Sequence, residues 1–308
     1  MGLRIGIVGS GAIGSYYGAK LAHAGSDVHF LMRGDLSEVR RDGILVRGQG
    51  ENFRVEKINC YNSTKDIGRC DLVIVAVKAT SNSDLVDLIP PLLRERTMLL
   101  TLQNGLGNDE FLAKHFGAGR VLGGLCFICV HRHSKTEVER YDYGRIVLGE
   151  FGRAPQARTH EVAAEFNRAA VQCTVTDDLA LERWRKLIWN IPFNGLSILG
   201  GGIDTGAIIS DKDLRQASLA LMNEVIAAAN KCGHALPRDA WREHVKRTET
   251  MGSYKPSTLL DWEAGRPLEI EPIWGEPLRR AVAADAEMPR TEMLYALLKQ
   301  LDQARRSR

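Results

Sequence analysis

One strongly apolar stretch of the sequence carries a lysine and two asparagines at helical spacing. Lys186, Asn190 and Asn194 are four residues apart within residues 178–197, so on a helix their side chains share one face. Burying a cation and two amides costs free energy unless polar groups meet them, and a bound polar substrate is one such partner. The alternative is that Lys186 extends to solvent while both amides bond the neighbouring backbone.

A glycine-rich turn near the N-terminus has the pattern that binds the pyrophosphate of a dinucleotide. Between a β-branched run at residues 5–8 and a stretch of helical spacing, the chain reads Gly9, Ser10, Gly11, Ala12, Ile13, Gly14. The first glycine permits a tight turn, the second lets phosphates approach the backbone, and the third lets helix and strand pack closely. The phosphates would then lie on the N–H groups at the positive end of the helix. A purely structural glycine turn is the alternative.

The residue after the second expected strand, residues 27–32, indicates which dinucleotide binds. An NAD-binding unit usually carries Asp or Glu there for the ribose 2′-hydroxyl, whereas this chain carries Arg33. Because a guanidinium can hold a 2′-phosphate through two hydrogen bonds, the predicted cofactor is NADP(H). The alternative is that Arg33 is a solvated loop charge.

Two further polar residues follow expected strands. The continuous apolar run at residues 71–77 suits a central parallel strand, and residues 97–102 predict the next one. Lys78 follows the first run and Asn104 the second. Since ligands bind beyond the carboxyl ends of strands in a doubly wound sheet, both side chains are expected to face the cofactor.

The elements that must position these residues predict two domains. Strand and helix signals alternate in the first part of the chain, whereas helical periodicity dominates after it. We therefore predict an α/β fold, with an N-terminal Rossmann-type doubly wound sheet over residues 1–174 and an all-helical substrate and catalytic domain over residues 175–308. Short alternating stretches at residues 44–46 and 53–55 predict an antiparallel excursion at the edge of the sheet.

Composition limits the class of protein. The 308 residues are 44% hydrophobic and 26% charged, which is ordinary for a globular protein. A net charge of +3 is too small to indicate nucleic-acid binding, and residues 305–308 form a basic tail that we expect to fray. No run has the length of a membrane span, and the first strand begins too early for a signal peptide. We expect a cytoplasmic protein that binds neither nucleic acid nor membrane, and a homodimer is compatible with the sequence.

The six cysteines do not indicate a disulfide framework in a chain of this length, and a cytosol would keep them reduced. Cys126 and Cys129 precede His131 and His133, which together resemble a metal cluster by composition. On a strand, however, the two thiols point to opposite faces and cannot chelate one ion. No metal site is predicted.

Five motifs occur in the order typical of one family, and the sequence resembles the ketopantoate reductase family over essentially its whole length. They are the glycine turn, V-K-A at residues 77–79, Q-N-G at residues 103–105, K-L-x-x-N-x-x-x-N at residues 186–194, and Ser257 followed by Asp261 and Glu269-Ile270. The resemblance implies NADPH-dependent reduction of 2-dehydropantoate to (R)-pantoate, a step toward pantothenate and coenzyme A.

The resemblance also implies roles for individual residues. Lys186 would donate the proton to the carbonyl oxygen, and Glu269 would orient substrate and lysine. The implied contacts of the 2-oxo acid are Asn104, Asn190, Asn194 and Ser257. The implied contacts of NADPH are Gly9, Ser10, Gly11, Ala12, Ile13, Gly14, Arg33, Lys78 and Asn104. The chemistry agrees, because hydride delivery to a 2-oxo acid makes an alkoxide, which an ammonium can stabilise and protonate.

Three positions depart from the pattern of the family. Tyr254 stands where an asparagine is frequent, and Glu271 and Trp274 alter the segment after Glu269. These changes leave cofactor and reaction type in place and weaken the substrate identity. The alternatives are a reductase of a different 2-oxo acid and a non-catalytic NADP(H)-binding sensor.

Overall fold

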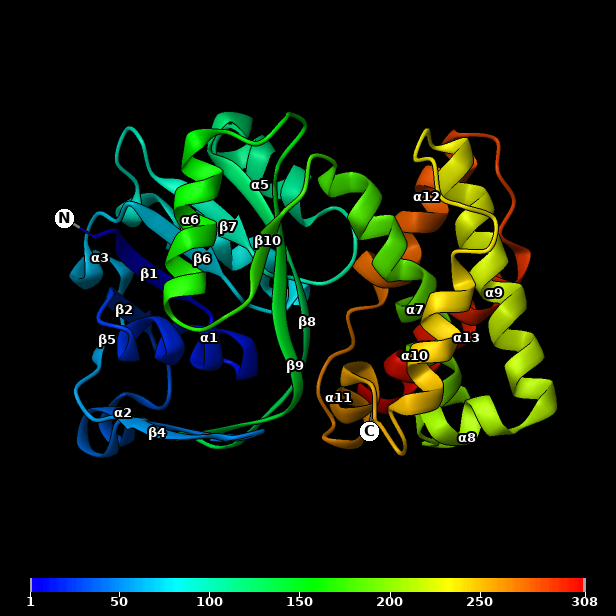
Figure 1. The fold of residues 1–308 in the computed structure, drawn as a ribbon, viewed down its shortest axis with the longest axis horizontal. Coiled ribbons are helices and arrows are strands. Elements are labelled where there is room, and N and C mark those ends of the chain that lie inside the picture. The colour runs from blue at the N-terminus through cyan, green and yellow to red at the C-terminus, as the bar shows by residue number, and fades with distance from the viewer. Residues whose placement is uncertain (1, 307–308) are drawn as a thin grey trace. The chain divides into compact units, whose positions relative to one another are not determined.

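The computed structural model describes residues 2–306, which form two compact units. The first comprises the described residues up to 103 together with residues 108–179, and it holds every strand of the described chain. The second comprises residues 104–107 and 180–306, which contain helices and loops (Figure 1). The domain boundary at residues 174/175 stays a prediction.

The strands of the first unit form one sheet in the order β4-β3-β9-β8-β7-β6-β1-β2-β5, with β10 paired to β9. Neighbouring strands from β5 to β8 are parallel, and the chain passes from one side of β1 to the other between β2 and β6. This reversal is the switch point at which doubly wound sheets bind ligands. The predicted Rossmann-type class is therefore confirmed. The strands are β1 (Arg4–Val8), β2 (Asp27–Leu31), β3 (Ile44–Gly48), β4 (Glu51–Val55), β5 (Asn59–Tyr61), β6 (Leu72–Val75), β7 (Met98–Thr101), β8 (Val121–Ser134), β9 (Glu137–Glu150) and β10 (Cys173–Val175).

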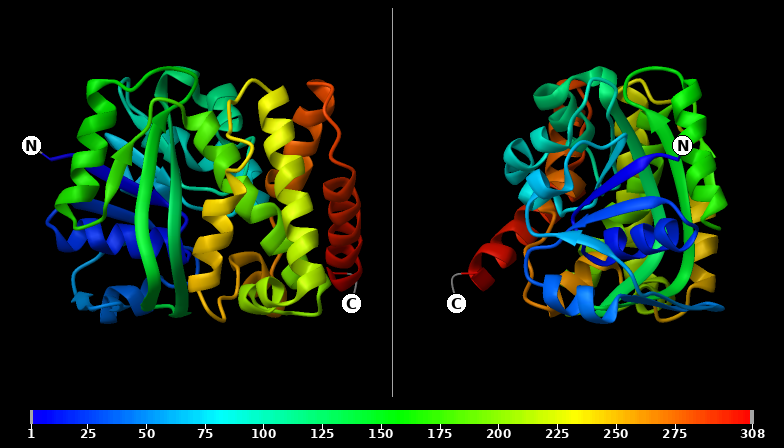
Figure 2. Two further views of the ribbon diagram at one scale, coloured as in Figure 1. Left: turned by 45° about the vertical axis from the view of Figure 1, so that its right-hand side comes forward. Right: turned by 90° about the vertical axis from the view of Figure 1, so that its left-hand side faces the viewer.

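Helices cover both faces of this sheet (Figures 1 and 2). The core on one face includes side chains of α1 and α6, and the core on the other includes side chains of α3, α4 and α5. Ile7 of β1 belongs to the first core and Val8 to the second, as expected for a strand buried on both sides. The helices are α1 (Ala12–His23), α2 (Leu36–Asp42), α3 (Thr64–Ile67), α4 (Leu85–Leu88), α5 (Asn108–Phe116) and α6 (Ala157–Arg168), with short 3-10 helices η1 (Ala79–Asp84), η2 (Pro90–Leu92) and η3 (Ala118–Arg120).

At the edge of the sheet, one antiparallel pair was predicted and one long hairpin was not. Strands β3 and β4 pair antiparallel, as the short alternating stretches indicate. Strands β8 and β9 are 14 residues each and form a long hairpin with three register shifts; strand around Cys126 was predicted, but the length and register of the hairpin were not. Charged residues in the middle of β9 and the register shifts of the hairpin interrupt the alternation that would have marked it.

The cysteines of the described chain are free, and Cys126 and Cys129 both lie on β8. Among residues 2–306, no group of three or more His, Cys, Asp or Glu side chains is arranged to hold a metal ion. None of the described helices has the length and apolar character needed to cross a membrane. Ser307 and Arg308 of the basic tail lie outside the described residues.

The second unit packs its helices around a core that includes Trp184, Ile188 and Trp274, each with 1% exposure or less. Helix α7 runs without interruption through Pro192. A loop at residues 200–204 joins α7 to α8. The helices are α7 (Leu179–Leu199), α8 (Thr205–Ser210), α9 (Lys212–Lys231), α10 (Trp241–Thr250), α11 (Ser257–Glu263), the π-helix η4 (Glu271–Gly275), α12 (Glu276–Ala283) and α13 (Pro289–Arg306).

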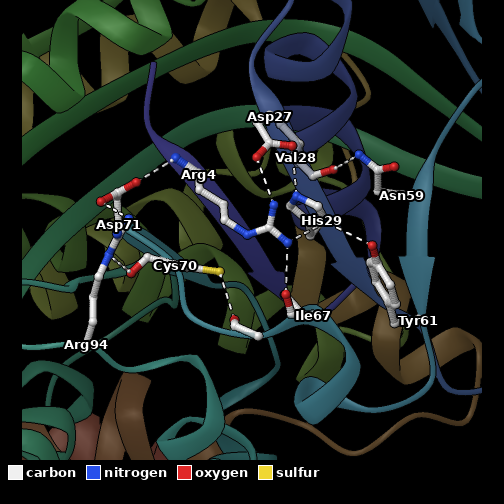
Figure 3. A network of polar contacts seen from close by, with 11 residues as sticks. Arg4, Asp27, Val28, His29, Asn59, Tyr61, Ile67, Cys70, Asp71 and Arg94 are labelled. Carbon is white, nitrogen blue, oxygen red and sulfur yellow. Dashed lines mark hydrogen bonds and ion pairs between the residues drawn. The ribbon is translucent and has the colours of Figure 1, made fainter. Parts of the chain in front are cut away.

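A polar network ties together the amino ends of the parallel strands (Figure 3). Arg4 donates to the carboxylate of Asp27 at 3.0 Å and to the carbonyl of Ile67 at 2.9 Å, and its own N–H donates to Asp71. Nε2 of His29 lies 2.8 Å from a carboxylate oxygen of the same Asp27. Burial and the charge of Arg4 lower the pKa of His29. Because ligands bind at the opposite, carboxyl ends, this network serves stability.

Helix α10 carries a titratable group that links stability to pH. Burial, followed by the charges of Arg247 and Arg185, lowers the pKa of His244 to about 4. Between this value and the unfolded pKa near ~6.5, the unfolded chain binds more protons than the folded one. Stability is therefore complete above pH ~6.5 and falls as the pH drops toward 4, by about 3 kcal/mol.

We predict that His244→Gln flattens this pH dependence. The free energy of unfolding, measured in urea at several pH values between 4.5 and 7, should fall less steeply in the variant than in the parent protein. The exposed His160, replaced in His160→Gln, is the control and should leave the slope unchanged. Equal slopes for His244→Gln and the parent would contradict the assignment.

Candidate functional site

Steric crowding shapes the glycine turn between β1 and α1. Gly9 has a φ of +107°, and a Cβ there would overlap the backbone nitrogen of Val77. A Cβ at Gly14 would overlap the carbonyl oxygen of Gly9. Both positions therefore require glycine, which fixes the turn and brings α1 close to β1.

Gly11 differs from its two neighbours. It is exposed, and a Cβ there would meet no protein atom within 4 Å. It is also the N-cap of α1, so no side chain caps the backbone N–H groups of the first turn, which starts with Ala12 and Ile13. That turn also has no acidic residue. Open space in front of uncapped N–H groups at a positive helix end is what a pyrophosphate requires. These residues fit the predicted dinucleotide.

The other predicted cofactor residues of the first unit lie at the same edge of the sheet. Ser10 Oγ donates to the carbonyl of Leu31 at 2.7 Å, which links the turn to the end of β2. Arg33 is exposed just beyond β2 and pairs with Asp84 at 2.8 Å. Lys78 is exposed just beyond β6. A 2′-phosphate would therefore compete with a solvent-exposed carboxylate for Arg33, and such exposed pairs are weak.

The loop that carries Asn104 belongs to the second unit. There, the half-buried Lys186 donates from Nζ to Asn104 Oδ1 at 2.8 Å. An amide oxygen cannot take a proton from an ammonium, so it directs the group without neutralising it. The structure thus joins two residues that the sequence separates by 82 positions.

The two asparagines of α7 are both buried, at 7% exposure for Asn190 and 2% for Asn194. Asn194 bonds the backbone at both ends of its amide. Its Nδ2 donates to the carbonyl of Asn190 at 2.8 Å, and its Oδ1 accepts from the N–H of Thr258 at 3.3 Å. For Asn194 the alternative of backbone bonding is therefore realised, and its contact with substrate stays a prediction.

Ser257 is exposed and is the first residue of α11, where a first-turn serine is expected. Because Asn194 binds the adjacent Thr258 N–H, α7 fixes the start of α11 and with it the place of Ser257. Glu269 is buried at 5% exposure and directly precedes the helix that begins at Ile270. Both roles in substrate binding and catalysis stay predictions.

The structure places all three departures from the family pattern. Trp274 is fully buried, and its Nε1 donates to the carbonyl of Ile191 at 3.1 Å. Glu271 accepts from the hydroxyl of Tyr295 at 2.7 Å, and its pKa is lowered, against the effect of burial, by hydrogen bonds from Arg279 and Tyr295. The third departure is aromatic: the ring of Tyr254 lies 6.0 Å from that of Trp189.

The sequence reasoning missed Arg183. This side chain is 5% exposed and its Nη1 reaches the carbonyl of Gly105 at 3.4 Å. Arg183 precedes Lys186 by three residues, so helical spacing places both on one face of α7. This spacing could have identified Arg183 from the sequence.

A Rossmann-type sheet with a glycine turn at its switch point, followed by a helical unit that carries a lysine, is the organisation of a dinucleotide-dependent oxidoreductase. Two family models match the chain, Ketopantoate reductase PanE/ApbA over residues 5–153 and Ketopantoate reductase PanE/ApbA C terminal over residues 178–302. The chain belongs to this ketopantoate reductase family.

Individual members of this family are similar to the chain over nearly its full length. A 2-dehydropantoate 2-reductase from Nostoc sp. is 38% identical and is matched over 97% of this chain and 95% of its own. The crystal structure of a 2-dehydropantoate 2-reductase from Geobacter metallireducens GS-15 has a TM-score of 0.95 at 44% identity, covering 97% of this chain and 100% of that one. The corresponding structure from Methylococcus capsulatus has a TM-score of 0.90 at 33% identity, covering 98% and 97%.

The open space at Gly11 leads to a prediction about cofactor binding. Gly11→Ala should weaken NADPH binding by about 10-fold or more, because its methyl group would lie where the phosphates approach, while the melting temperature of the cofactor-free protein changes little. Gly14→Ala is the contrasting variant and should lower that melting temperature, since its methyl group overlaps Gly9. NADPH titration and thermal unfolding measure the two effects. Unchanged NADPH affinity in Gly11→Ala would argue against phosphate binding at this turn.

Proposed function

We propose that this protein reduces 2-dehydropantoate to (R)-pantoate with NADPH, a step in pantothenate synthesis in the cytoplasm. The observation that supports this most directly is the 2.8 Å bond between Lys186 Nζ and Asn104 Oδ1, which holds a cation in the unit that carries the predicted substrate groups. Membership of the ketopantoate reductase family and the names of its relatives supply the substrate.

The residues of the chain divide the work of this reaction. Bound NADPH supplies the hydride. The Lys186 ammonium stabilises the negative charge that develops on the carbonyl oxygen and then donates a proton from Nζ. Asn104 directs that ammonium, and Glu269 orients lysine and substrate. The 2-oxo acid is bound by Asn190, Asn194 and Ser257, with Asn104 as a further contact.

The cofactor is held by residues 1–174 in this proposal, and residues 175–308 carry substrate and catalytic groups. The glycine turn, with its open space at Gly11, takes the pyrophosphate. Arg33 exchanges Asp84 for the 2′-phosphate and so selects NADP(H) over NAD(H). Lys78 adds a second cation at the carboxyl end of β6.

A different 2-oxo acid is the second candidate substrate. The rings of Trp189 and Phe193 lie 5.1 Å apart on α7, and Tyr254 extends this group. Since Phe193 is fully buried in the core, only Trp189 and Tyr254 of this group are partly exposed beside Asn190, and they favour a 2-oxo acid with a larger apolar side chain. A panel of 2-oxo acids that includes 2-dehydropantoate, assayed by NADPH oxidation, separates the two candidates.

The role of Lys186 has a direct test. Lys186→Ala should lower kcat by roughly 10²–10⁴-fold, the usual contribution of a positioned acid, while NADPH affinity changes little. Lys186→Arg should not restore the rate, because a guanidinium keeps its charge and releases a proton poorly. The exposed Lys231, replaced in Lys231→Ala, serves as the control. Near-parental kcat in Lys186→Ala would remove this lysine from the mechanism.

We also propose that the protein forms a homodimer through α13. Met293, Leu297 and Leu301 are 63%, 47% and 37% exposed and are spaced four apart, so they form one apolar stripe. Exposed apolar stripes of this kind mark interaction sites. Glu292 and Arg306 lie two heptads apart on the same flank of α13, so antiparallel packing of a second copy would bring each close to the other.

The dimer is tested by sedimentation. The parent protein should sediment as a dimer at micromolar concentration, and Leu297→Glu should shift it toward monomer because a carboxylate would be buried at the contact. Val86→Glu alters an exposed apolar residue of the first unit, 41% exposed, and should leave the dimer intact. A parent protein that is monomeric at these concentrations would exclude the interface.

A further inference from the structure

The loop at residues 104–107 fits tightly against the π-helix η4. Gly105 has a φ of +81°, and a Cβ at this position would overlap the carbonyl group of Pro272. The next residue, Leu106, donates its N–H to the same Pro272 oxygen at 2.8 Å. One carbonyl group of η4 therefore excludes a side chain at Gly105 and binds the backbone of the following residue.

The loop is also held by side chains. Leu106 is 3% exposed and belongs to the hydrophobic core of the second unit. From α7, Arg183 reaches the carbonyl of Gly105 at 3.4 Å. The loop is thus fixed between α7 and η4, and π-helical turns of this kind are frequent at functional sites.

This fit determines where the neighbouring amide lies. Asn104 directly precedes Gly105, and its Oδ1 accepts from Lys186 Nζ at 2.8 Å. A hydrogen bond of this length weakens steeply when the acceptor moves or turns. A methyl group at Gly105 would force the loop away from Pro272, and Asn104 would move with it.

We propose that Gly105 and the Pro272 carbonyl form a clamp that positions Asn104, and through Asn104 directs the Lys186 ammonium. Gly105 and Pro272 are positioning residues, since neither contributes a side-chain group that reacts. The expected effect of the clamp on turnover rests on the proposed function, because it requires that Lys186 is the acid.

The chain provides a matched control at Gly107. Its φ of +91° is also in the left-handed region, so alanine would be strained there as at Gly105. However, a Cβ at Gly107 would lie no closer than 3.5 Å to its nearest neighbour, Glu276 Cγ. A comparison of the two alanine variants therefore separates backbone strain in the loop from loss of the Pro272 contact.

The experiment compares Gly105→Ala, Gly107→Ala, Asn104→Ala and the double variant Gly105→Ala/Asn104→Ala. Gly105→Ala should lower kcat about 10-fold or more beyond Gly107→Ala. An acceptor on an ammonium favours its charged form, so the alkaline limb of the kcat profile should move to lower pH in Gly105→Ala and in Asn104→Ala. The double variant should be no slower than Asn104→Ala, because both changes remove one interaction.

A second measurement does not depend on turnover. The titration of the Lys186 ammonium is followed by NMR in protein labelled at lysine Cε, with the signal assigned through Lys186→Arg. Its midpoint should be lower in Gly105→Ala than in Gly107→Ala. This difference in a protein that reduces no 2-oxo acid would support the clamp while the proposed function fails.

Several outcomes would overturn the clamp. They are a parental pH profile in Gly105→Ala, equal effects of Gly105→Ala and Gly107→Ala, and additive losses in the double variant. If Gly105→Ala does not fold, Leu106→Ala takes its place, since it removes the core anchor of the loop without changing any charge near Lys186. That variant should shift the Lys186 titration in the same direction, and an unchanged titration would contradict the proposal.

Discussion

The bond between the Lys186 ammonium and the Asn104 side chain is the interaction on which the rest of the candidate site depends, because a cation in an apolar helical unit needs a polar partner to orient it. Trp184 and Ile188 anchor α7 in the core, which fixes the backbone on both sides of Lys186. The side chain then leaves the core and donates to Asn104 at 2.8 Å. Because Asn104 comes from a loop that separates two stretches of the first unit, the position of the cation depends on how firmly this loop is held.

The glycines of this protein meet two opposite steric requirements. At Gly9, Gly14 and Gly105 the backbone of another segment occupies the space of a side chain. At Gly11 the protein leaves that space open. The first kind sets the distance between elements, and the second leaves room for a ligand. A glycine motif in a sequence does not distinguish the two kinds, whereas the neighbouring atoms do.

Local patterns were sufficient to predict part of this structure. The glycine turn, the buried strand β6 and the shared face of Lys186 and Asn190 all follow from spacing along the chain. The bond of Asn194 to the Thr258 N–H did not follow, since Thr258 lies 64 positions away. The membership of residues 104–107 in the second unit was equally hidden, because it depends on contact with Pro272. Such pairings require the folded chain, and the sequence alone cannot rank them.

The three residues that depart from the family pattern have different structural settings. Trp274 and Glu271 depart from the family pattern, and each has a structural partner that accounts for it: Trp274 bonds Ile191, and Glu271 accepts from Tyr295. Tyr254 has a different setting, because its ring faces Trp189.

Trp189 is itself fixed, since its Nε1 donates to Thr248 at 3.0 Å and Thr248 in turn donates to the carbonyl of His244 at 2.7 Å. The bond to Thr248 fixes the ring of Trp189 against α10, within the turn of α7 that carries Asn190. Because the ring of Tyr254 lies 6.0 Å from this fixed ring, we expect a change at Tyr254 to alter selectivity among 2-oxo acids.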